Sequence, residues 1–364
     1  MRRPHLQTAA HALAGTIFCL ELEGHAPSCP INFWDATARI PPSEIRYWTF
    51  DVRRWTFASM SETAELVVKG KKLSVSNLNK VLYPKVGFTK GQVIDYFIRI
   101  APVLLPHLKD RPLTMKRYPN GVDAEFFYEK NCPTHRPKWV KTARVWSEGH
   151  NRMMDYCLAQ DLPTLVWAAN LADLELHTSL AKKKDVARPT MIVFDLDPGA
   201  PADIVQCCQV GLWLRDLLGA MKLKSFTKTS GSKGLQVYVP LNTPVTFDQT
   251  KDLSRALAQL LEREHGSLVT SNMPKAVRKG KVFVDWSQND EHKTTICVYS
   301  LRAKDEPTVS TPVTWDEVAN CLKKRKADLL KFRSDKVLAR VEKNGDLFAP
   351  VEKLKQKLPK KWKL

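Results

Sequence analysis

Two aspartates, Asp195 and Asp197, stand at the end of the apolar run 191–194 and are followed by Pro198 and Gly199. Side chains at i and i+2 of a β-strand point to the same face, so the two carboxylates project side by side. Like charges that close need a cation nearby. A second apolar run, 282–284, leads into a third carboxylate, Asp285. Three carboxylates on two strand ends suit a pair of Mg²⁺ or Mn²⁺ ions about 3.5–4 Å apart, as in phosphoryl and nucleotidyl transfer.

The size and charge of the chain narrow its class and its partners. With 364 residues, 43% of them hydrophobic, it can bury a substantial core in one large domain or two tightly joined ones. The net charge of +19 favours a polyanionic partner. Residues 321–364 hold 15 Lys and Arg against 5 Asp and Glu, so more than half of the excess lies there.

The eight cysteines form no Cys-x-x-Cys pair and no Cys/His set with zinc spacing. We therefore expect reduced thiols in a cytoplasmic protein. No apolar stretch approaches the roughly 18–20 residues of a membrane span.

The hydrophobic periodicity divides the chain. Residues 1–59 carry no sustained period and are expected to be a disordered or mis-called N-terminal extension, so a chain starting at Met60 should keep full activity. A catalytic domain is expected over 60–345, with an N-terminal α/β part at about 60–185 and a metal-site sheet at about 186–310. A basic C-terminal tail is expected over 346–364.

The patterning predicts interleaved helices and strands, and therefore an α/β or α+β domain with a mixed sheet. Thr89 is a candidate N-cap for the first helix. The predicted strands are 65–68, 72–75, 113–117, 124–128, 191–195, 225–229, 235–239, 281–285 and 295–299. The predicted helices are 90–105, 162–171, 202–218 and 247–264, and residues 315–324 and the tail to Leu364 are expected to be helix or loop.

A glycine- and serine-rich loop, 229–234, lies between two predicted strands. Its two glycines let backbone N–H groups converge as an anion nest, and Ser230, Ser232 and Lys233 add donors suited to a triphosphate. An ordinary Gly-Ser hairpin is the alternative, and the P-loop spacing is absent. Arg278, in a basic turn before Asp285, could clamp a phosphate with its planar fork or could simply be solvated.

Other readings of these motifs stay open at the level of single residues. Haloacid-dehalogenase phosphatases also use Asp-x-Asp, but Gly199 stands where they usually carry Thr or Val. Glycosyltransferases that hold a metal–nucleotide diphosphate remain competitors. His177 alone is more often structural than catalytic. Bases and aromatics interleave at 115–118 and 126–128, as in a nucleic-acid groove or, more commonly, in a core strand.

Taken together, the motifs become specific. The segments around Asp195 and Asp197, around 230–235 and around Asp285 are similar, in order and spacing, to the three motifs of archaeo-eukaryotic-type primases. The chain most resembles the polymerase domain of bacterial DNA ligase D, which serves non-homologous end joining. Further matching stretches are 79–84, 111–117, 170–177, 299–303 and 345–348, so the likeness runs from about Glu65 to the C-terminus.

The resemblance implies an α+β fold, in which a primase-like core with a mixed, RRM-like sheet is flanked by helices and joined to an N-terminal α/β unit. It implies that Asp195, Asp197 and Asp285 hold two Mn²⁺ or Mg²⁺ ions for catalysis. It also implies nucleotide contacts and DNA contacts. The nucleotide-binding residues are Lys116, His177, Ser230, Ser232, Lys233, Gln236, Arg278 and Gln288. The DNA-binding residues are Lys80 and Lys90, on a downstream 5′-phosphate, and Phe126 and Phe127, stacked on the template.

The expected function is addition of NTPs or dNTPs to a 3′-OH at gaps or broken DNA ends. The expected partners are DNA with 5′-phosphate ends, a Ku-type end-binding protein and a separate ATP-dependent DNA ligase, with no membrane involved. One departure matters: the family's second motif usually ends in His, where this chain has Gln236, which cannot carry a positive charge. The alternatives are a catalytically weakened DNA-end bridging protein, a de novo primase or, ranked low, a sugar-nucleotide transferase.

Overall fold

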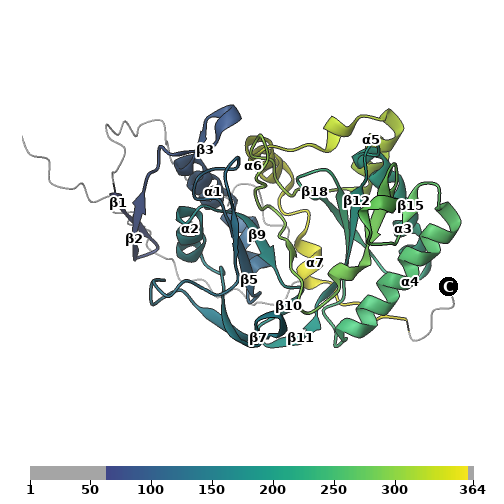
Figure 1. Cartoon of the computed structure of the whole chain (residues 1–364), viewed down its shortest axis with the longest axis horizontal. Helices are drawn as coiled ribbons and strands as arrows, with labels where there is room; N and C mark the ends of the chain where they lie inside the picture. The colour runs from purple at the N-terminus through teal and green to yellow at the C-terminus, as the bar shows by residue number, and fades with distance from the viewer. Residues whose placement is uncertain (1–62, 360–364) are drawn as a thin grey trace, which may run out of the picture.

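A computed structural model describes residues 63–359 of the chain, and residues 1–59 of the expected extension lie outside it. Two large sheets stand side by side with helices packed around them (Figure 1). The mixture confirms the expected α+β class. The helices are α1 (Lys90–Leu108), α2 (Leu162–Asn170), α3 (Ile204–Ala220), α4 (Phe247–His265), α5 (Trp315–Lys324), α6 (Ser334–Asn344) and α7 (Ala349–Lys353). Within residues 63–359, no helix is both long and apolar enough to cross a bilayer.

The first sheet has the strand order β17-β9-β5-β8-β7, and β6 also pairs with β5. Its strands are β5 (Leu113–Arg117), β6 (Phe127–Glu129), β7 (Thr142–Ser147), β8 (Arg152–Cys157), β9 (Asp173–Thr178) and β17 (Thr295–Ile296). Helix α1 begins where the sequence indicates, because Thr89 and Gln92 form a reciprocal capping box. The strand predicted at 124–128 lies later than expected, since Phe126 precedes β6.

The second sheet has the order β15-β16-β12-β14-β13-β18. Its strands are β12 (Met191–Pro198), β13 (Phe226–Thr229), β14 (Leu235–Pro240), β15 (Val269–Thr270), β16 (Val282–Asp285) and β18 (Pro312–Val313). Three two-stranded sheets complete the fold: β1 (Thr63–Val68) with β2 (Lys71–Ser76), β3 (Val81–Tyr83) with β4 (Phe88–Thr89), and β10 (Ala181–Lys182) with β11 (Asp185–Pro189).

The alternation along β12 decides where its carboxylates point. Ile192, Phe194 and Leu196 are buried in the core that the second sheet forms with α3, α4 and α5. Met191 and Val193 belong instead to the other core, which is shared with the first sheet. Residues two apart share a face, so Asp195 and Asp197 continue the row of Met191 and Val193. They therefore lie on the face of the second sheet that is turned toward the first.

One strand of the later half belongs to the first sheet, so the boundary expected near residue 186 does not separate the two sheets completely. Strand β17 comes from the later half but pairs with β9 of the first sheet, Thr295 opposite Thr178. Beyond residue 345, where a basic tail was expected, the chain stays packed. Asp346 accepts hydrogen bonds from the Tyr299 hydroxyl (2.8 Å) and pairs with His107 (2.9 Å), and Val351 is buried. Residues 360–364 lie outside the described part.

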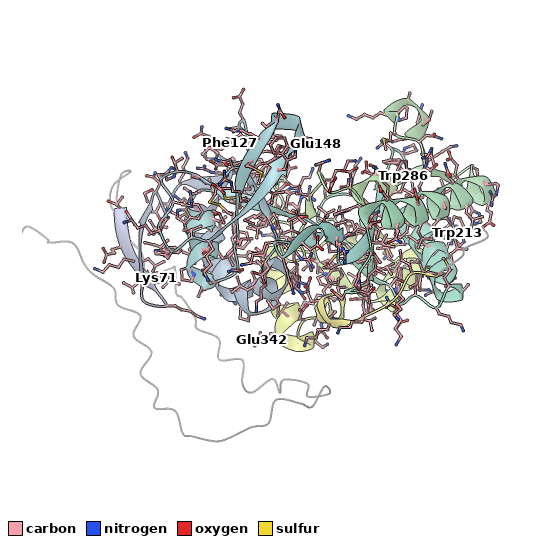
Figure 2. The ribbon with its side chains drawn as sticks, turned by 90° about the horizontal axis from the view of Figure 1, so that it is seen from below. Lys71, Phe127, Glu148, Trp213, Trp286 and Glu342 are labelled. Atoms are coloured by element: carbon pink, nitrogen blue, oxygen red, sulfur yellow. A yellow bond between two sulfur atoms is a disulfide. The ribbon has the colours of Figure 1, made fainter. Side chains whose placement is uncertain are left out.

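The expectation that all cysteines are reduced is wrong for one pair, because Cys132 and Cys157 form a disulfide. The bridge joins the loop after β6 to the end of β8, and Figure 2 shows Phe127 of β6 and Glu148, from the turn after β7, at the same edge of the molecule. The pairing escaped sequence analysis because 25 residues separate the two cysteines and no motif connects them. Among the described residues, four cysteines are free, and all are buried: Cys207, Cys208, Cys297 and Cys321.

Candidate active site

The three aspartates predicted as metal ligands lie on adjacent strands. Asp195 of β12 pairs with Asp285 of β16 in antiparallel register, and directly opposite residues share a face. Burial, together with the charge of Asp285, raises the pKa of Asp195 to about 6, although the Gln236 amide opposes the shift. Divalent cations prefer carboxylate oxygens and would offset this surplus of negative charge, so the donor set fits metal ions.

In this conformation, however, the aspartates are held by other side chains. Asp197 pairs with Lys233 (3.3 Å) and Arg278 (3.6 Å). Asp285 accepts hydrogen bonds from the amide and hydroxyl of Ser287 and from Gln288 (2.9 Å). Within residues 63–359, no three Asp, Glu, His or Cys side chains converge as a ready metal cage. Metal binding would therefore draw these carboxylates away from the groups that now neutralise them.

The predicted anion-binding loop runs from Ser230 to Gly234, between β13 and β14. The Ser230 hydroxyl accepts hydrogen bonds from the amides of Ser232 (3.2 Å) and Gly234 (3.1 Å), so it shapes the loop from within. Gly231 has φ +70°, and a Cβ on Gly234 would lie 2.3 Å from the Leu196 carbonyl oxygen. Gly234 therefore lets the loop lie against β12, and Gly231 supplies the positive φ that the turn requires. Lys233 extends from it with an exposed side chain.

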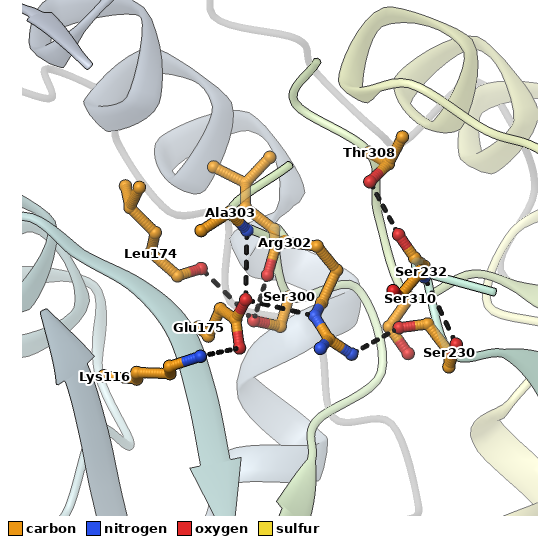
Figure 3. A network of polar contacts seen from close by, with 12 residues as sticks. Lys116, Leu174, Glu175, Ser230, Ser232, Ser300, Arg302, Ala303, Thr308 and Ser310 are labelled. Carbon is orange, nitrogen blue, oxygen red and sulfur yellow. Dashed lines mark hydrogen bonds and ion pairs between the residues drawn. The ribbon is translucent and has the colours of Figure 1, made fainter. Parts of the chain in front are cut away.

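A buried carboxylate that sequence analysis did not single out, Glu175 of β9, connects this loop to the first sheet (Figure 3). Glu175 pairs with Lys116 (3.5 Å), His177 (3.1 Å) and Arg302 (3.3 Å), and accepts the Ala303 amide (3.0 Å). Arg302 also donates to the Ser230 carbonyl at 2.7 Å. The predicted nucleotide contacts Lys116 and His177 are thus brought together with Ser230.

The electrostatics of this network follow from its burial. Desolvation alone would raise the pKa of Glu175, but the hydrogen bond from His177 and the charges of Arg302 and Lys116 hold it well below its usual range. Desolvation lowers the pKa of His177, and its hydrogen bond to Glu175 opposes that shift. Two signals in the sequence point to the network in retrospect. Glu175 and His177 are two apart on one strand, and Arg302 lies in the matching stretch 299–303.

Gln236 and Lys228 form a second buried pair behind the aspartates. Gln236 of β14 lies opposite Asp195 and is 3% exposed, so it is placed beside the metal face and not in an open nucleotide pocket. The Lys228 ammonium donates to its side-chain oxygen at 2.5 Å. Sequence analysis missed Lys228 because a single lysine in a short strand reads as a solvent-facing residue.

The residues predicted to contact DNA lie around α1 and β6. Lys80 is exposed and donates to Asn120 (3.0 Å), and the Lys90 amide donates to the Lys80 carbonyl (2.8 Å). Lys90 is buried and donates to the Ser76 carbonyl (2.7 Å), and desolvation lowers its pKa to about 8. Phe126 and Phe127 are 48% and 43% exposed, which leaves part of each ring accessible to a base.

The family model "LigD, primase-polymerase domain" matches residues 89–348. The chain belongs to this family. It is similar to the multifunctional non-homologous end joining protein LigD of Mycolicibacterium smegmatis, with 41% identity over 78% of this chain and 36% of that protein. It is also similar to the bifunctional LigD of Bacillus subtilis, with 34% identity over 75% of this chain and 43% of that protein.

A solved structure gives the same result for the fold. The polymerase domain of Mycobacterium tuberculosis ligase D, determined in complex with DNA, superposes with a TM-score of 0.72 at 40% identity and covers 77% of this chain and 98% of that one. The expected primase-like α+β fold is thereby confirmed. The LigD polymerase family is one of metal-dependent nucleotidyltransferases in DNA end joining. The chain spans only about two fifths of the length of the LigD proteins it matches.

Proposed function

We propose that this chain is a primase-type polymerase that adds nucleotides to a 3′-OH at gaps or broken DNA ends. The observation that carries the proposal is one continuous path of contacts across the site. It starts at Asp197, passes through Lys233 to the Ser230 loop, and reaches Glu175 and Lys116 through Arg302. Carboxylates for cations and basic groups for a triphosphate are thereby joined in one surface.

Asp195, Asp197 and Asp285 would hold the two Mn²⁺ or Mg²⁺ ions. When bound, such ions would help to ionise the primer 3′-OH and would offset the charge of the departing pyrophosphate. The chain's own residues do the rest. Lys233, Arg302 and Arg278 would bind the phosphates, and Ser230 would fix the loop that presents them.

The DNA substrate we propose carries a 5′-phosphate on the downstream side of the gap. Lys80 and Lys90, whose backbones share a hydrogen bond, would supply two ammonium groups for that phosphate, and Lys90 would exchange its bond to the Ser76 carbonyl for it. Phe126 and Phe127 would stack on the template strand. The partners we propose are NTPs or dNTPs, a Ku-type end-binding protein and an ATP-dependent DNA ligase that seals the filled end.

The decisive experiment is primer extension across a short gap with a downstream 5′-phosphate. Mn²⁺ or Mg²⁺ and NTPs or dNTPs would be supplied in turn, and D195A would serve as the control. We expect templated incorporation that D195A abolishes. Binding that depends on the 5′-phosphate without incorporation would instead support a DNA-end bridging protein. Incorporation on a template that lacks a primer would support a de novo primase.

A further inference from the structure

Lys228 of β13 is a charged residue with no exposed surface and no place in the function proposed above. Its side chain is completely buried. The ammonium group donates to the side-chain oxygens of Gln236 (2.5 Å) and Ser310 (2.6 Å) and lies 5.3 Å from the centre of the Tyr238 ring. Among the described residues, no carboxylate pairs with it. A buried lysine without a counter-ion is costly, so its retention asks for a reason.

The contacts of Lys228 fix which end of the Gln236 amide faces which neighbour. The amide oxygen accepts hydrogen bonds from Lys228 and from the Tyr238 hydroxyl (3.4 Å). Gln236 lies directly opposite Asp195 across the two strands, and its amide lowers the pKa of that carboxylate. A carboxylate only accepts, so the amide nitrogen is the group that donates to Asp195. With the nitrogen toward Lys228, two donors would face each other.

Lys228 is itself held in place from the other side. The Ser310 hydroxyl donates to the Thr229 carbonyl (3.0 Å), so its oxygen is left to accept from the ammonium group. The Ser310 amide in turn donates to the Ser300 carbonyl (2.9 Å). The lysine therefore connects Gln236 of β14 to Ser310, whose own position is fixed by hydrogen bonds to backbone carbonyls.

We infer that Lys228 is a positioning residue for the metal site: it locks the Gln236 amide so that its nitrogen orients the Asp195 carboxylate. Groups that hold a metal ligand by hydrogen bonds typically change metal affinity by about 10- to 100-fold when they are removed. This inference rests on the proposed function for the role of Asp195. It assigns that function an orienting pair of residues that does not touch nucleotide or DNA.

The test is a double-mutant cycle on Mn²⁺ affinity, with K228M, Q236L and K228M/Q236L. Free Mn²⁺ would be followed by electron paramagnetic resonance with no DNA or nucleotide present. D195A marks the loss of the site. We expect each single variant to bind Mn²⁺ about tenfold more weakly, and the double variant to be no weaker than either one. Losses that multiply in the double variant would overturn the inference, and so would K228M with unchanged affinity.

Folding is separated from positioning by the double variant. Removing both partners of a buried hydrogen bond is far milder than removing one. K228M/Q236L is therefore expected to unfold near the wild-type temperature while still binding Mn²⁺ about tenfold more weakly. Wild-type affinity in this folded variant would overturn the inference even if K228M alone did not fold. T227V is the matched control, since Thr227 is buried one residue away and bonds only the Gln236 backbone carbonyl.

A histidine at position 236 provides a further test. A neutral imidazole also offers one acceptor and one donor, so Q236H should bind Mn²⁺ more tightly than Q236L. Equal affinities for the two variants would count against an orienting hydrogen bond. The binding assay contains no DNA. Suppose that Mn²⁺ affinity depends on Lys228 as expected but the wild-type protein incorporates no nucleotide. That result would refute the proposed function and leave this inference standing. A wild type without Mn²⁺ binding would refute the inference.

Discussion

Asp195 and Asp285 stand directly opposite one another on two antiparallel strands, and no basic side chain among residues 63–359 forms an ion pair with Asp195. Burial makes ionisation of Asp195 unfavourable, and the nearby charge of Asp285 makes it more so. The fold thus maintains a repulsive pair that a cation would relieve. Asp197, by contrast, is already paired with Lys233 and Arg278. Metal-dependent function and metal-free stability should therefore respond oppositely to the same substitution.

Replacing Asp285 by Asn tests that opposition. D285N should reduce primer extension by at least about a thousandfold, because a charged ligand is lost at the reacting phosphate. The metal-free protein should unfold at the same or a higher temperature, since the repulsion of Asp195 is removed. Primer extension and thermal unfolding in a chelator measure the two effects. A variant that is both inactive and destabilised would show that Asp285 is structural.

The second prediction concerns Glu175. E175Q removes the charge that holds Lys116, His177 and Arg302 together, so the nucleotide KM should rise about tenfold or more. The free energy of unfolding should fall by about 3 kcal/mol, because buried basic groups lose their partner. Steady-state kinetics and denaturant unfolding would be compared.

A matched control exists in the same chain. Glu352 is another poorly exposed carboxylate with several basic partners, pairing with Arg111 (2.7 Å) and Lys182 (2.9 Å), but it belongs to the C-terminal segment. E352Q should lower stability by a similar amount and leave the nucleotide KM unchanged. An equal rise of KM in both variants would mean that stability alone explains the result.

The third prediction is a pH dependence at Lys90. Its pKa is lowered to about 8, so the ammonium form that binds a phosphate is lost above that pH. The preference for 5′-phosphorylated over 5′-hydroxyl DNA should be nearly constant below about pH 7 and should fall as the pH rises through about 8. Fluorescence anisotropy at fixed ionic strength measures both substrates. A preference that stays constant to pH 9.5 would argue against Lys90.

Unfolding cannot imitate that loss. Folded Lys90 has a lower pKa than the ordinary lysine value of 10.5, so the unfolded chain binds more protons between about pH 8 and 10.5. The contribution of Lys90 therefore makes the folded state more stable as pH rises through this window. Thermal unfolding at each pH separates the two effects.

The sequence predicted the parts of the site that depend on local periodicity. The alternation in β12 placed Asp195 and Asp197 on one face, and the capping residues placed the start of α1. It could not predict contacts between distant segments. Glu175 and Arg302 meet only after β9 packs beside the loop from β17, and Lys228 has meaning only once β13 and β14 pair. The Cys132–Cys157 disulfide was missed for the same reason.

The last prediction concerns the two exposed rings before and within β6. The Lys116 ammonium lies 4.1 Å from the ring centre of Phe126, and the Arg117 guanidinium lies 4.9 Å from that of Phe127, while about half of each side chain is exposed. F126A and F127A should each weaken binding to a template overhang by about 1–3 kcal/mol, the usual value of stacking on one base. Stability should change little, because both rings are largely exposed. L329A, which removes an exposed apolar side chain of the second half, is the control. Loss of affinity for the overhang in L329A, or none in either phenylalanine variant, would place the template elsewhere.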